Sequence, residues 1–73
     1  MNATLRSLVD ERGLRQDWLA AQLGVSEASM SKWLRGVARL PITQVGPLAE
    51  VFGVSAETIV TAAVRTRETV ENL

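Results

Sequence analysis

The sequence predicts an all-α domain of five packed helices, and three observations support this fold class. The chain has 73 residues, so it can bury one core of about a dozen side chains. Apolar residues make up 47% of it, but two Trp, one Phe and no Tyr favour helix packing over an aromatic-rich sheet. Each of four glycines follows an apolar-periodic stretch, where a left-handed residue commonly ends a helix: Gly13, Gly24, Gly36 and Gly53. We therefore expect residues 1–73 to form one compact five-helix domain.

Apolar residues recur at helical spacing in the first three expected helices. These helices cover about 4–12, 16–23 and 27–35. Ser26 precedes the third, and its hydroxyl can accept a hydrogen bond from the amide of Ser29, as an N-cap does. The side chains that the spacing turns toward the core are Leu5, Leu8, Val9, Leu19, Ala20, Leu23, Met30, Trp33 and Leu34.

The fourth expected helix, 42–52, is interrupted by a Gly46-Pro47 pair. Because Pro47 cannot donate to the carbonyl of Thr43, we expect a kink or a 3₁₀ start there. The apolar residues whose spacing marks this segment as helical are Ile42, Val45, Leu48, Val51 and Phe52. Ser55 can cap a fifth helix from 56 to about 70, although many β-branched residues weaken its helix propensity.

Several classes of chemistry are disfavoured by composition. The chain has no Cys and no His, so a disulfide framework, a thiol nucleophile, an imidazole base and a zinc site are not expected. The carboxylates, for example Asp10 and Glu11, suggest no opposed catalytic pair, so neither enzyme activity nor a cofactor is expected. The sequence shows neither a signal-peptide pattern nor a run of about 18 apolar residues. We expect a cytoplasmic protein without a membrane partner or an evident small-molecule ligand.

Charge is zero in sum but unevenly placed. Residues 12–39 hold five basic side chains against two acidic ones, an excess of three positive charges. Residues 40–73 hold two basic side chains against four acidic ones, an excess of two negative charges. The asymmetry suggests a surface for phosphates within 12–39, with scattered surface charge as the alternative.

The segment GLRQDWLAAQLGVSEASMSKWLRG, residues 13–36, has the pattern of two short helices joined by a tight turn. Ala20 is small enough for the helices to cross closely, and Gly24 tolerates the positive φ that the turn needs. This segment, together with LAEVFGVSAETI at 48–59, resembles the lambda-repressor-like family of phage repressors and Cro proteins, also called the XRE family. The resemblance implies a helix-turn-helix at 16–35 with double-stranded DNA as its partner.

The resemblance places the third helix in the major groove, where short side chains let a helix approach the base edges. Glu27 can accept from a cytosine amino group and Ala28 can touch a thymine methyl, while Lys32 can reach a guanine or a phosphate. Ser29 can serve several bases, but helix capping is an alternative role for it. The base-reading residues implied are Glu27, Ala28, Ser29 and Lys32.

Contacts with the DNA backbone are implied around the same helix. Gln16 matches the family's anchoring glutamine at the start of the second helix, whose N-terminus favours anions. Arg15 stands where the family usually has a small capping residue, so the helix loses about 1 kcal/mol of capping and gains a cation near the DNA. We expect at least one of the arginines to be only a solvated surface charge. The phosphate contacts implied are Arg15, Gln16, Ser26, Arg35, Arg39, Thr43 and Gln44.

Three more positions depart from the family pattern: Val9, Leu34 and Trp18. Many members pair an arginine late in the first helix with a glutamate late in the third, whereas this chain has Val9 and Leu34, which avoid the desolvation of two charges. Trp33 matches a core position. Trp18 occupies a commonly polar position, and the sequence leaves open whether it packs on a neighbouring helix or belongs to a partner-binding patch.

A single domain with so little net charge is expected to bind DNA weakly. The family commonly overcomes this with a two-fold dimer whose recognition helices lie about 34 Å apart. We expect the C-terminal helix, 56–70, to supply the dimer surface, with Trp18 or Leu40 at its border. The alternative is that Val60 and Val64 complete the core of the monomer. The dimer residues expected are Val60, Val64, Val70 and Leu73.

These observations together predict a sequence-specific transcription regulator that binds double-stranded DNA as a homodimer, most simply a repressor that occludes a promoter. The rival interpretation is a protein-interaction module with the same fold, such as an antitoxin or an anti-repressor. Zero net charge and the exposed Glu27 keep that rival open. Binding that weakens steeply with salt would favour DNA, because an apolar protein interface depends little on ionic strength.

Overall fold

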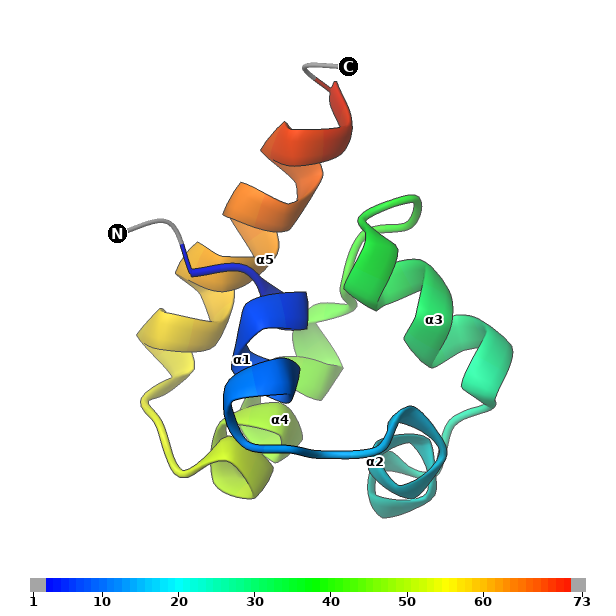
Figure 1. Cartoon of the computed structure of the whole chain (residues 1–73). Helices are drawn as coiled ribbons and strands as arrows, with labels where there is room; N and C mark the ends of the chain where they lie inside the picture. The colour runs from blue at the N-terminus through cyan, green and yellow to red at the C-terminus, as the bar shows by residue number, and fades with distance from the viewer. Residues whose placement is uncertain (1–2, 72–73) are drawn as a thin grey trace.

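The computed structural model describes residues 3–71, with side chains described as far as residue 69. Five α-helices and one 3₁₀ helix account for the regular structure of this part, in which no residue forms a strand (Figure 1). They are α1 (Leu5–Glu11), α2 (Gln16–Leu23), α3 (Glu27–Arg35), η1 (Ile42–Gln44), α4 (Val45–Phe52) and α5 (Ala56–Glu71). The expected all-α fold is confirmed, and the helix bounds agree closely with the apolar periodicity.

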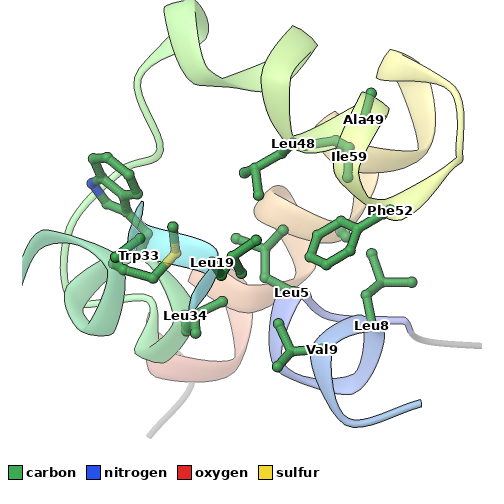
Figure 2. Packing of buried hydrophobic residues seen from close by; sticks show 13 residues of the cluster. Leu5, Leu8, Val9, Leu19, Trp33, Leu34, Leu48, Ala49, Phe52 and Ile59 are labelled. Atoms are coloured by element: carbon green, nitrogen blue, oxygen red, sulfur yellow. The ribbon is translucent and has the colours of Figure 1, made fainter. Parts of the chain in front are cut away.

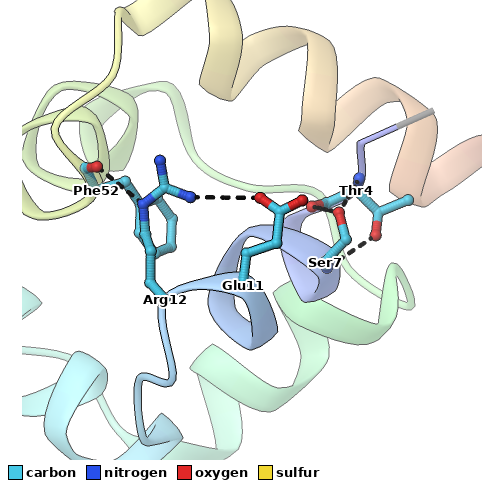
Figure 3. Close-up of polar contacts among 5 residues, drawn as sticks. All are labelled: Thr4, Ser7, Glu11, Arg12 and Phe52. Carbon is cyan, nitrogen blue, oxygen red and sulfur yellow. Dashed lines mark hydrogen bonds and ion pairs between the residues drawn. The ribbon is translucent and has the colours of Figure 1, made fainter. Parts of the chain in front are cut away.

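Three helices begin at a hydroxyl side chain. Thr4, Ser26 and Ser55 each accept a hydrogen bond from the backbone amide three residues further on, at 3.2, 3.1 and 3.1 Å. At α1 the cap is reciprocal, since the side chain of Ser7 accepts from the amide of Thr4 (Figure 3). Arg15 precedes α2 without a side-chain cap, as its long side chain led us to expect.

The connection between α2 and α3 turns at a left-handed residue. Gly24 has φ +69°, which an L side chain adopts only with strain. The amide of Val25 then donates to the carbonyl of Ala20 at 3.0 Å, closing the end of α2. The four glycines predicted as helix ends all have positive φ.

The core is apolar and receives side chains from all five α-helices (Figure 2). Val9 and Leu34 are 1% and 3% exposed, so the apolar replacement of the family's charged pair is buried. The buried residues are Leu5, Leu8, Val9, Leu19, Ala20, Met30, Trp33, Leu34, Leu48, Ala49, Phe52, Ile59 and Ala62. Leu23, Val45 and Val51 pack against this core half-buried.

One apolar residue of the segment 42–52 is not buried. Ile42 is 86% exposed, because the chain from 42 to 44 forms the 3₁₀ helix η1 instead of the first turn of α4. Pro47 falls in the first turn of α4, where a missing amide leaves no hydrogen bond unmade. The expected 3₁₀ start is confirmed, and it removes Ile42 from the buried face.

Polar contacts fix both ends of α1. Its first amide, on Leu5, donates to the buried hydroxyl of Thr66 in α5 at 3.0 Å, and that hydroxyl donates to the carbonyl of Ala62 at 2.8 Å. Just after α1, the Arg12 guanidinium donates to the carbonyl of Phe52 at 3.0 Å and lies 5.7 Å from the centre of its ring (Figure 3). These contacts hold α1 against α4 and α5.

In the described part of the chain, no single helix is both long and apolar enough to cross a membrane. The segments 42–52 and 56–69 are long and apolar enough only when they are taken together, and the chain bends by 113° between them.

Candidate nucleic-acid interface

The outer face of α3 is open to solvent, and α3 lies along one side of the molecule next to α2 (Figure 1). Glu27, Ala28 and Lys32 are exposed, and Ser29 is half-buried. The opposite face carries Met30, Trp33 and Leu34 into the core. Three of the four side chains predicted to read bases therefore stand on the free side of a helix that is packed on its other side, and Ser29 is partly covered.

At the start of α3 the two serines are bonded to one another. The Ser26 hydroxyl accepts from the amide of Ser29 and donates to its hydroxyl, both at 3.1 Å. Ser26 acts as the predicted N-cap, and its hydroxyl proton is donated to the Ser29 hydroxyl. The Ser29 hydroxyl accepts in that contact, so its own proton remains free for an external acceptor.

An ion pair that the sequence reasoning missed occupies the start of α2. The Arg15 guanidinium donates to both carboxylate oxygens of Asp17, Nε to Oδ1 at 3.1 Å and Nη2 to Oδ2 at 2.8 Å. Asp17 Oδ1 also accepts from the backbone amide of Trp18 at 2.7 Å. The bond from Arg15, and next the bond from the Trp18 amide, lower the pKa of Asp17 below its ordinary 3.8. The only sequence signal was two opposite charges on either side of the first helical residue.

The remaining residues predicted to contact phosphate lie at several places. Gln16, the first residue of α2, is half-buried. Arg35 in the last turn of α3 is exposed, with Nε donating to the hydroxyl of Ser31 at 3.1 Å. Thr43 in η1 is exposed, while Gln44 is half-buried with its buried Oε1 unpartnered among the described residues. In the sequence, Arg35 ends α3, and Thr43 and Gln44 follow it in η1.

Arg39 is exposed and lies on an apolar groove of about 400 Å³ between α5 and the chain that leads into α4. In this groove Val60 and Val64 are 47% and 54% exposed, so the alternative that they complete the monomer core is wrong. The groove is lined by Arg39, Leu40, Ile42, Val45, Val60, Ala63, Val64, Arg67 and Glu68. The side chain of Val70 and the whole of Leu73, both predicted dimer residues, lie outside the described part of the chain.

Two tryptophans have different environments. Trp33 is 9% exposed within the core, as predicted, whereas Trp18 on α2 is 45% exposed. Trp18 is therefore only partly covered by its own chain. No group of three or more acidic, Cys or His side chains in the described part is arranged to hold a metal.

Two helices joined by a glycine turn, the second with one packed and one open face, define a helix-turn-helix protein. Comparison with known families agrees: the model of the helix-turn-helix domain family matches residues 2–62. The chain belongs to this family, in agreement with the lambda-repressor-like resemblance. Its members are DNA-binding regulators and are typically not enzymes. No curated protein and no solved structure matches the chain.

Proposed function

We propose that this protein is a sequence-specific repressor that places α3 in the major groove of an operator. The observation that carries this proposal is the outer face of α3, where Glu27, Ala28 and Lys32 are exposed while the other face is packed. A helix with short side chains on its free side can approach base edges closely. Glu27 accepts from cytosine, Ala28 meets a thymine methyl, and the Ser29 hydroxyl donates its free proton.

Backbone contacts flank this face in the proposal. Gln16 starts α2, whose N-cap residue Arg15 makes no capping hydrogen bond, so the first-turn amides before that of Trp18 can meet an external acceptor. Arg15 and Arg35 are exposed on either side of the helix pair. Such contacts orient the protein on the duplex without selecting a sequence.

The test is selection of bound duplexes from a random pool with the wild type, Glu27→Ala and Gln16→Ala. Glu27→Ala should lose discrimination at one base pair by about 1–3 kcal/mol, and Gln16→Ala should weaken all sequences alike. Glu50→Ala is the matched control, since it removes an exposed glutamate from α4. A wild type without any sequence preference, or a Glu27→Ala variant that selects the same sites, would overturn the proposal.

Repression has its own test. A promoter that overlaps the selected site should lose transcription in vitro as protein is added, because occupied DNA excludes the polymerase. Increased transcription would show an activator instead and would leave the DNA contacts unaffected.

We further propose that the groove beside α5 joins two copies of the chain on the operator. Val60, Val64 and Ile42 expose apolar surface there beyond what the monomer core uses. The groove also carries two cations, Arg39 and Arg67, and an anion, Glu68; the Arg67 guanidinium donates to the carbonyl of Gly36. A two-fold interface repeats each contact, so it can contain two ion pairs, each between Arg39 of one copy and Glu68 of the other. That complementarity favours a second copy over an unrelated partner.

Matched substitutions in α5 test this dimer. Val64→Asp places a charge in the groove, whereas Thr61→Asp places it on an exposed part of α5 outside the groove. Sedimentation at micromolar concentration, free and with operator, should show a dimer for the wild type and Thr61→Asp and a monomer for Val64→Asp. A wild type that is monomeric in both conditions would remove the dimer and leave the groove to another partner.

A further inference from the structure

The first turn of α2 holds a carboxylate where DNA binding would place a phosphate. Asp17 accepts from three donors at once: two guanidinium nitrogens of Arg15 and the backbone amide of Trp18. Guanidinium nitrogens and first-turn helix amides are the donors that bind phosphates in proteins. Asp17 thus occupies with its own negative charge donors that lie on both sides of Gln16 in the sequence.

This ion pair is on the surface. The side chains of Arg15 and Asp17 are 80% and 45% exposed, so water and a duplex reach both. Since exposed pairs of this kind are held weakly, a phosphate can displace the carboxylate from Arg15. The displaced carboxylate stays in the same turn, where it repels the phosphate.

We infer that Asp17 is an affinity-setting residue that competes with DNA phosphate for Arg15 and for the start of α2. The inference rests on the proposed DNA binding. Asp17 lowers the affinity for all sequences alike, because it acts on a backbone contact and no base is involved. Its effect is to keep the protein from remaining on unrelated DNA, which binds through phosphates alone.

Asp17→Asn tests the inference with little structural disturbance, because asparagine keeps an oxygen that accepts from the Trp18 amide. The affinities of the wild type and the variant are measured for the selected operator and for random-sequence duplexes, from about 50 to about 200 mM salt. Glu57→Gln is the matched control, since Glu57 lies in the first turn of α5, outside the helix-turn-helix. Arg15→Ala and the double variant complete a cycle.

Asp17→Asn should bind both duplexes roughly three- to tenfold more tightly at low salt, with a salt slope steeper by about 0.9 for one more phosphate contact. The ratio of its affinity to that of the wild type should then fall about three- to fourfold between the two salt concentrations. The gain should be smaller in the Arg15→Ala background, and Glu57→Gln should bind like the wild type.

Three results would overturn the inference while DNA binding stands. Equal binding by Asp17→Asn would mean that Asp17 does not compete with phosphate, and weaker binding would mean that the carboxylate aligns Arg15 for the duplex. A changed sequence preference would mean that Asp17 reads a base. A wild type that binds neither duplex would overturn the proposed function, and this inference with it.

Discussion

At the start of α2 a charged side chain replaces the hydroxyl caps that begin α1, α3 and α5. Arg15 cannot bond the first-turn amides, and Asp17 instead accepts from the amide of Trp18. The sequence predicted the missing cap. It did not predict the ion pair, because residues two apart meet only when the chain bends between them, as it does where Arg15 is extended and Asp17 is helical.

The lowered pKa of Asp17 gives a prediction at the residue scale. A carboxyl whose folded pKa lies below its unfolded value adds stability above the unfolded pKa, and this is lost as the pH falls through the folded value. The stability difference between the wild type and Asp17→Asn should therefore shrink as the pH falls below 3.8. Urea melts at several pH values measure it.

A titration followed by NMR is the control for this prediction. Arg15→Ala removes the principal cause of the shift, so it should bring the pKa of Asp17 back toward 3.8. An Asp17 pKa that is the same in Arg15→Ala as in the wild type would contradict the assigned cause.

At the scale of the elements, α3 is fixed at both ends and along its inner face. Ser26 caps its start, and Arg67 of α5 donates to the carbonyl of Gly36 just after its end, at 2.8 Å. Trp33 and Leu34 anchor the side between them. A helix held at this many points can present its outer face without moving, which a base-reading element needs.

Leu34 gives the prediction for this element. Leu34→Glu would bury a charge whose family partner is replaced by Val9, so it should destabilise the domain by about 3–5 kcal/mol. Leu34→Met keeps the volume and should cost less than about 1.5 kcal/mol. Urea melts compare the two variants. Equal stability of Leu34→Glu and the wild type would show that Leu34 does not face the core.

Capping residues and glycines in the sequence predicted the bounds of the helices well. They did not predict features that depend on contacts between distant parts of the chain. Gly24 and Gly36 predicted where α2 and α3 end, and Ser26 predicted where α3 begins. These residues act on the backbone within a few positions along the chain. The sequence did not show that Ile42 is exposed, since its spacing from Val45 fits either an α-helix or a 3₁₀ turn. The bond from Arg12 to Phe52 joins residues 40 apart, so no local pattern could reveal it.

For the whole molecule, the proposed DNA contacts and the proposed dimer groove use different surfaces. The outer face of α3 and the start of α2 come from the motif, and the sequence predicted their residues. The groove is assembled from α5 and from the chain between α3 and α4, so its shape depends on packing. The sequence could name Val60 and Val64 as surplus apolar residues, but not Ile42 and Arg39 beside them.

The most direct test of the central claim is a map of backbone amide shifts in ¹⁵N-labelled protein as the selected duplex is added. The largest changes should occur at Gln16 and from Glu27 to Lys32, because the proposed interface is the outer face of α3 and the start of α2. Shifts confined to α1 and α4, with α3 unchanged, would contradict the account.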